Sequence, residues 1–157
     1  FHHNIIMVSN IYIDEVLRKF NNFLGTFSSD NIPKLSENQG VICNFSKESE
    51  EGTHFIFLFF RENKIYYFDS LKLGIIPNDI HSYISSYPFF MDISRSIQHN
   101  SSSFCGFYCI LAFIACNIKI DFFLNDVLPV FNDKSLENDK ICVKLINRLF
   151  QISSSVK

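Results

Sequence analysis

The sequence lacks several features that would assign it to a class of protein at once. Charged residues make up only 19% of its 157 residues while 47% are apolar, which excludes an intrinsically disordered chain and indicates a packed globule. Its longest apolar runs, such as residues 55–60, fall far below the ~18 residues that a membrane span requires. Neither sign of charge prevails, because 14 Lys and Arg face 16 Asp and Glu, so a global attraction to nucleic acid or to an anionic membrane is excluded.

The chain also shows no internal repeat, no linker composition and no secretory signal. We therefore expect one domain over residues 1–157, of which residues 1–8 are a disordered tail or an expression remnant. The five cysteines are odd in number and have no framework spacing, so we expect reduced thiols in a cytosol-like compartment. They are Cys43, Cys105, Cys109, Cys116 and Cys142. No second Cys or His pair accompanies Cys105 and Cys109 at zinc-site spacing, so the sequence predicts no metal and no cofactor.

Hydrophobic periodicity and turn residues predict mixed helix and strand. The expected elements are a helix over 11–22, a long surface loop over 23–40, a strand over 41–45, a hairpin of 54–60 and 65–70 joined by a four-residue turn, a helix over 77–87, a strand over 91–97, a buried helix that begins near Cys105, and an amphipathic helix over 139–150.

The hairpin brings two chemically competent side chains to one end of the sheet. An even loop between its strands pairs residues whose numbers sum to 125, with Phe60 opposite Ile65 and Ile56 opposite Asp69. Because side chains alternate, His54 and Asp69 then lie on the same face as diagonal neighbours. The carboxylate can accept the imidazole N–H and stabilise the imidazolium. The alternative is that both residues merely flank the hairpin as polar punctuation.

Cys105 stands at the start of the predicted buried helix, where free backbone N–H groups favour a thiolate. The alternative is an inert core cysteine, which is the commoner use of that residue. Gln98 lies in the polar loop just before the helix and can donate to an oxyanion together with the Cys105 N–H, or it is simply solvated. His81 and His99 are expected to be solvated.

Together these residues carry a family resemblance. The order His54, Asp69, Gln98, Cys105, within GTHF, YYFDS and Q-x6-CGFYC, resembles the adenovirus-type cysteine protease (adenain) family, which has relatives in large DNA viruses, virophages and Polinton-like elements. The broader clan includes the proteases specific for SUMO and other ubiquitin-like proteins. The segment FNNFLGTFSSDNIP is similar to a segment that adenains carry after their first helix, so the resemblance covers about residues 10–117.

The resemblance implies an α+β fold in which a central mixed or antiparallel sheet packs against a buried helix that carries the nucleophile. It implies His54 as general base, Asp69 as its orienting acid, Gln98 as oxyanion donor and Cys105 as nucleophile. Substrate-contacting roles are implied for Gly25, Thr26 and Gly106. Two departures are that Phe55 replaces the Trp that commonly follows the histidine, and that an Asp replaces the Glu of some members.

The resemblance implies fewer activating partners for this chain than the adenoviral members have. A peptide activator is compatible with the resemblance, but residues 85–96 contain no Cys for a disulfide attachment. DNA stimulation is not expected, because the chain is slightly acidic and the stripe of Lys140, Lys144 and Arg148 is typical of a solvated helix face. We expect a monomer.

The predicted function is a viral cysteine endopeptidase that cleaves structural precursors, notably capsid proteins, during particle maturation in the virion and the host-cell cytoplasm. One alternative is a deubiquitinase or a protease specific for ubiquitin-like proteins that acts on host conjugates. Another is a catalytically silent module that binds the capsid. The sequence alone predicts neither the cleavage motif nor the need for an activator.

Overall fold

The computed structural model describes residues 8–49 and 54–155, without the side chains of residues 154 and 155. In chain order its elements are α1 (Asn10–Leu17), β1 (Phe23–Phe27), β2 (Gln39–Asn44), β3 (Phe55–Arg61), β4 (Lys64–Phe68), α2 (Asn78–Ser85), β5 (Phe89–Asp92), α3 (Cys105–Ile118), α4 (Ile120–Phe122), η1 (Phe123–Val127), η2 (Leu128–Val130) and α5 (Glu137–Ser155).

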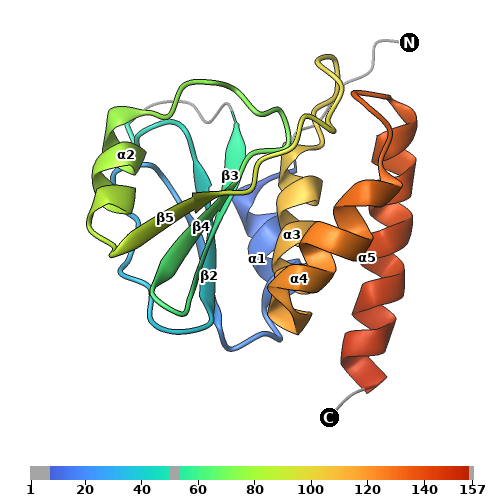
Figure 1. Cartoon of the computed structure of the whole chain (residues 1–157), viewed down its shortest axis with the longest axis horizontal. Coiled ribbons are helices and arrows are strands. Elements are labelled where there is room, and N and C mark those ends of the chain that lie inside the picture. The colour runs from blue at the N-terminus through green and yellow to red at the C-terminus, as the bar shows by residue number, and fades with distance from the viewer. Residues whose placement is uncertain (1–7, 50–53, 156–157) are drawn as a thin grey trace.

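One mixed sheet forms the centre of the fold, with the strand order β1-β2-β3-β4-β5. The pairs β2–β3 and β3–β4 are antiparallel, whereas β1–β2 and β4–β5 are parallel. Helix α2 covers one face, α1 and α3 lie against the other, and α5 packs outside α3 (Figure 1). The expected α+β fold with a sheet against a buried helix is therefore confirmed.

The β3–β4 hairpin has the predicted register. Phe60 pairs with Ile65 and Arg61 pairs with Lys64, so the loop contains two residues rather than the expected four. These residues, Glu62 and Asn63, both have positive φ angles, 51° and 66°. This conformation is typical of a type I′ turn, whose twist matches that of the flanking strands.

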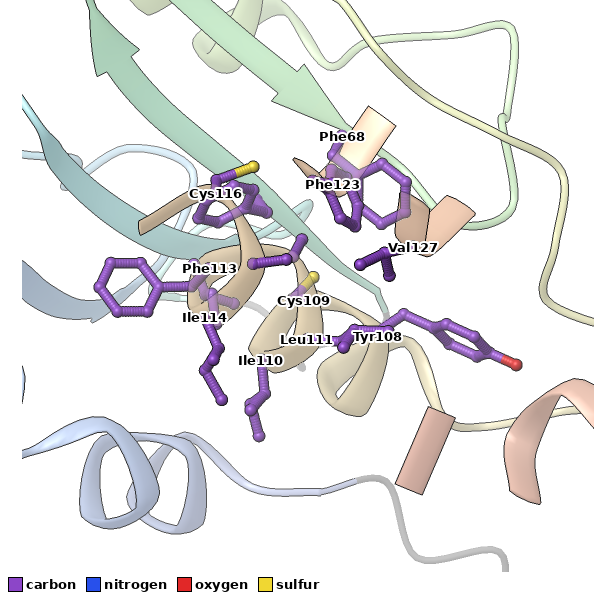
Figure 2. Close-up of a cluster of buried hydrophobic side chains, with 14 of the residues drawn as sticks. Phe68, Tyr108, Cys109, Ile110, Leu111, Phe113, Ile114, Cys116, Phe123 and Val127 are labelled. Atoms are coloured by element: carbon purple, nitrogen blue, oxygen red, sulfur yellow. The ribbon is translucent and has the colours of Figure 1, made fainter. Parts of the chain in front are cut away.

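Alternation along the strands divides the apolar core into two parts. Ile42, Phe57 and Phe68 face α3, while Val41 and Leu58 face α2. Eleven of the fourteen residues of α3 are buried, so this helix is enclosed between the sheet and the later helices. Figure 2 shows Phe68 of β4 beside Phe123, with the sulfur atoms of Cys109 and Cys116 inside the same cluster.

Gly40 explains how α3 approaches the sheet so closely. A Cβ atom on this residue of β2 would lie 2.9 Å from Cδ1 of Phe113 and 3.0 Å from Cδ1 of Phe59. Such contacts are too short for a well-packed core. The missing side chain therefore makes room for the Phe113 ring, which α3 packs against this face of the sheet.

Several predicted bounds were wrong. The predicted loop over 23–40 contains β1. This strand was not predicted because Gly25, with a φ of 129°, interrupts the usual alternation of apolar and polar residues. The first helix ends at Leu17 instead of Asn22, and the strand expected over 91–97 is Phe89–Asp92. The turns α4, η1 and η2 were not predicted, and α5 extends beyond 139–150 at both ends.

Residues 1–7 of the predicted tail lie outside the described residues, as do residues 50–53 between the predicted strand over 41–45 and the hairpin. Val8, the last residue of the predicted tail, packs against the core. Within 8–49 and 54–155, no helix is long and apolar enough to cross a membrane. Lys140, Lys144 and Arg148 are exposed on α5, in agreement with a solvated face.

Candidate active site

Three of the predicted site residues meet at one end of the sheet. His54 immediately precedes β3, Asp69 immediately follows β4, and Cys105 is the first residue of α3. Their exposed fractions are 6%, 0% and 3%. A buried imidazole, carboxylate and thiol in one place need specific partners, because an unpaired buried polar group is costly.

The contact between His54 and Asp69 is direct. Nε2 of His54 lies 2.7 Å from Oδ1 of Asp69. The same Oδ1 accepts the backbone N–H of Leu71 at 2.9 Å, and Oδ2 accepts that of Leu73 at 3.0 Å. Backbone donors therefore orient the carboxylate. The Phe45 ring meets the imidazole edge to face, at 4.9 Å between centroids.

The surroundings of His54 favour its charged form. Burial alone lowers the pKa of His54, but hydrogen bonds to the Asp69 carboxylate and to the Cys105 sulfur, together with the negative charge on each of these groups, raise the pKa to about 9. The imidazole is therefore protonated at neutral pH. Because Nε2 contacts Asp69, Nδ1 is the ring nitrogen that remains for Cys105.

Cys105 differs from the other cysteines in its partner. All five thiols are free and buried. Burial raises the pKa of Cys43, Cys109, Cys116 and Cys142. Cys105 is the one that hydrogen-bonds to His54, and it lies at a helix start, where the first N–H groups have no acceptor within the helix. The arrangement provides a cysteine with an adjacent base and a positive helix end.

Gln98 is held beside this group with its amide fixed at both ends. It is only 1% exposed. Its Oε1 accepts the hydroxyl of Ser70 at 2.6 Å, and its Nε2 donates to the carbonyl of Ser102 at 2.9 Å. An amide nitrogen carries two hydrogens, so one remains to donate elsewhere. A solvated Gln98, the alternative from sequence, does not agree with this burial.

Three serines of this network were missed by the sequence analysis. Ser70 donates to Gln98, and its carbonyl accepts the N–H groups of Ile97 and Gln98, both at 3.0 Å. Ser94 accepts the backbone N–H of Asp69 at 2.9 Å. Ser102 is the acceptor for the Gln98 amide. Only Ser70 had a signal in the sequence, because it directly follows Asp69 in YYFDS.

Gly25 and Thr26 lie in β1, the edge strand next to β2. The backbone N–H and the hydroxyl of Thr26 both donate to Oδ1 of Asp14 at 3.0 Å. Thr26 also lines a cavity of about 410 Å³ with a largely polar lining that includes Asn10 and Asn44. The roles of Gly25 and Thr26 in binding substrate stay predictions.

Gly106 has a packing role in addition to its predicted one. A Cβ atom here would lie 2.5 Å from Cγ1 of Val8 and 3.3 Å from Cδ1 of Ile13. The residue next to Cys105 must therefore lack a side chain so that residue 8 and α1 can pack against α3. Its predicted contact with substrate stays a prediction.

His81 and His99, the other histidines of the described residues, are not part of this group. His81 is exposed on α2, and Nδ1 of His99 accepts the backbone N–H of Ser101 at 3.0 Å. In the part of the chain that the structure describes, no three His, Cys, Asp or Glu residues are grouped so that they could hold a metal ion.

The fold is shared with a known protease. No family model and no curated protein matches the chain. Among solved structures it is similar to the crystal structure of the ASFV pS273R protease, with 15% sequence identity and a TM-score of 0.53. The match covers 78% of this chain and 63% of that chain, so this chain spans less than two thirds of that protease. The likeness shows a common fold.

Proposed function

We propose that this protein is a cysteine endopeptidase with His54, Asp69, Gln98 and Cys105 as its catalytic residues. The observation that carries the proposal is the placement of His54 between the Asp69 carboxylate and the Cys105 thiol, with a pKa raised to about 9. A proton held on His54 at neutral pH is what a thiolate–imidazolium pair requires. The likeness to a protease of the same fold supports this assignment.

In the first half of the proposed reaction, the Cys105 thiolate attacks the scissile carbonyl carbon and forms a C–S bond. The negative charge moves to the carbonyl oxygen, where the free amide hydrogen of Gln98 and the Cys105 N–H stabilise it. Nδ1 of His54 then gives its proton to the amide nitrogen as the C–N bond breaks. The amine leaves, and an acyl thioester remains on Cys105.

In the second half, the neutral imidazole takes a proton from a water molecule that attacks the thioester carbon. The oxyanion again forms at Gln98, and its collapse breaks the C–S bond and restores the thiolate. The Asp69 carboxylate stabilises the imidazolium at both stages. Its two backbone donors, Leu71 and Leu73, keep the carboxylate in place for this.

The proposed substrates are viral structural precursors, notably capsid proteins cleaved during particle maturation in the virion and host-cell cytoplasm. The adenain-like order of site residues and the fold support this choice. Gly25, Thr26 and Gly106 would border the bound peptide on the β1 side of Cys105. The polar lining beside Thr26 favours a substrate with a polar side chain at that position.

The first test needs no substrate. Iodoacetamide labelling across ~pH 4 to ~pH 9, followed for each cysteine by mass spectrometry, should modify Cys105 rapidly below ~pH 7 and leave the four other thiols nearly unlabelled. His54→Ala should abolish this selectivity, while the exposed-histidine control His81→Ala should preserve it. A Cys105 that reacts as slowly as an ordinary thiol would contradict the proposed ion pair.

Turnover is the second test. Wild-type protein should cleave capsid precursor, and Cys105→Ala should not. Much faster cleavage of a ubiquitin-like C-terminal reporter than of the precursor would instead identify a protease that acts on host conjugates. Unchanged particle maturation with Cys105→Ala would identify a catalytically silent binding module and overturn the proposal.

A further inference from the structure

The loop over residues 97–104 is the second part of the connection between β5 and α3. It carries Gln98 near its beginning and Phe104, the residue before Cys105, at its end. On one side it is held by Ser70, directly after Asp69, through the backbone and side-chain contacts of Gln98. On its other side it lies beside the start of α5, as Figure 1 shows near the upper end of that helix. The second set of contacts comes from residues that the proposed mechanism does not use.

Asn138 is the first of these residues. It is 0% exposed. Its Nδ2 donates to the carbonyl of Ile97 at 2.8 Å and to that of Asn132 at 2.6 Å, and its Oδ1 accepts the N–H of Asn132 at 3.0 Å. A side chain buried with both amide hydrogens and its oxygen in use has one orientation. It therefore fixes the backbone immediately before Gln98.

Asp139 is the second, and it acts on the other end of the loop. Its Oδ1 accepts the Ser102 hydroxyl at 3.0 Å and the Tyr108 hydroxyl at 2.8 Å. The hydroxyl oxygen of Ser102 accepts the N–H of Phe104 at 3.1 Å. The backbone carbonyl of Ser102 accepts the Gln98 amide. Ser102 thus joins three groups: the carboxylate on α5, the oxyanion donor and the start of α3.

We propose that Asn138 and Asp139 are positioning residues for the oxyanion donor Gln98, and this inference rests on the function proposed above. Neither side chain contacts Cys105 or His54 in the described hydrogen bonds. They act through Ile97 and Ser102, which set where the free amide hydrogen of Gln98 points. Small displacements of such a donor cost much of its effect, because an oxyanion site works by being organised before the charge forms.

The test compares two matched variants in the first turn of α5. Asp139→Ala removes the carboxylate that Ser102 contacts, and Glu137→Ala removes an exposed carboxylate at the same helix end. We expect kcat on a precursor peptide to fall about tenfold for Asp139→Ala with KM within about twofold, because the lost interaction acts in the transition state. Glu137→Ala should keep wild-type kcat. Asp139→Asn, which retains an acceptor oxygen, should restore most of the loss.

A double-mutant cycle tests whether Asp139 acts through Gln98. In a Gln98→Ala background, Asp139→Ala should lower kcat by less than twofold, since its target is already absent. A further tenfold loss in that background would show that Asp139 acts elsewhere and would overturn the proposal. Iodoacetamide labelling of Cys105 should be the same in Asp139→Ala as in wild type, because the pair with His54 is intact.

Hydrogen exchange separates this inference from the proposed function. Backbone amides of Ile97, Gln98 and Phe104 should exchange faster in Asp139→Ala than in Glu137→Ala, while β3 and β4 keep wild-type protection. Wild-type protein without any turnover would contradict the proposed function, but faster exchange confined to the loop would still support the positioning role. Equal exchange in the two variants would contradict that role.

Discussion

The candidate site consists of two halves that are held in different ways. His54 and Asp69 are 15 residues apart in sequence and meet because they flank one hairpin. Gln98 is held from Ser70, 28 residues away, and its loop from Asn138, 41 residues from Ile97. The first half follows from strand register, which is local. The second follows from polar side chains that reach the loop from distant elements.

This difference indicates where the site is robust and where it is fragile. A two-residue turn and cross-strand pairs hold the hairpin half, so the loss of one side chain elsewhere leaves it in place. Apart from the buried Ile97 and the half-buried Phe104, the loop half is held by hydrogen bonds between polar groups. Removing one partner of such a bond leaves the other unsatisfied. Four experiments measure how far this contrast holds.

The largest expected effect comes from breaking the hairpin half chemically. Asp69→Asn keeps the size of the side chain but removes the charge that stabilises the imidazolium, so kcat should fall by about 10³–10⁴-fold. Ser70→Ala, the adjacent change on the loop half, removes one hydrogen bond to Gln98 and should lower kcat about tenfold. Steady-state kinetics on one peptide gives both values. Equal losses would show that the two halves contribute alike.

The loop half should show the larger loss of stability. Asn138→Ala leaves the Ile97 and Asn132 carbonyls without their donor, so the free energy of unfolding should fall by about 3 kcal/mol. Asn147→Ala, an exposed position on the same helix, should change it by less than about 0.5 kcal/mol. Urea unfolding measures both. A small effect at Asn138 would mean that Ser70 and Asp139 hold the loop without it.

The hairpin half should give the protein a pH-dependent stability. The pKa of His54 is raised to about 9 in the folded protein, so its stabilising contribution is complete below ~6.5, the unfolded value, and is lost as pH rises through about 9. Urea unfolding should show a loss on the order of 2 kcal/mol over this range. The loss should be absent in His54→Gln and present in His81→Gln. A flat wild-type profile would contradict the raised pKa.

The smallest expected effect is a gain at the hairpin turn. Glu62 has a φ of 51°, where Asn is better tolerated than Glu, so Glu62→Asn should stabilise the fold by about 0.5 kcal/mol. Glu15→Asn, at an exposed position of α1, should instead destabilise the fold, because Asn is a poorer helix former. Thermal unfolding with unchanged kcat would show that the turn is separable from the chemistry. A destabilised Glu62→Asn would contradict the type I′ assignment.

The contrast also explains what the sequence could predict. Aromatic and β-branched residues allowed the hairpin to be predicted. The pairing rule then placed His54 and Asp69 on one face of the sheet, as in the structure. The buried helix that begins at Cys105 was readable from its continuous apolar run. These signals lie within short windows of the chain. The proposed roles of the residues stay predictions.

The remaining contacts could not be predicted because their partners are distant. Asn138 and Asp139 look like ordinary polar residues at the start of an amphipathic helix, and Ser102 is one of three consecutive serines. Nothing near them in sequence marks the buried carbonyl or hydroxyl that they meet. Strand β1 was missed for a different reason, since Gly25 has a positive φ and its neighbours are only half-buried.

The position of Asn138 and Asp139 late in the chain has a consequence for protein synthesis. The hairpin, the loop and the cysteine at the start of α3 leave the ribosome before α5 does, and chains fold progressively as they emerge. Until α5 has been made and has docked, the loop lacks its contacts from Asn138 and Asp139. A nascent chain therefore carries Cys105 before the loop that holds Gln98 has its contacts from α5.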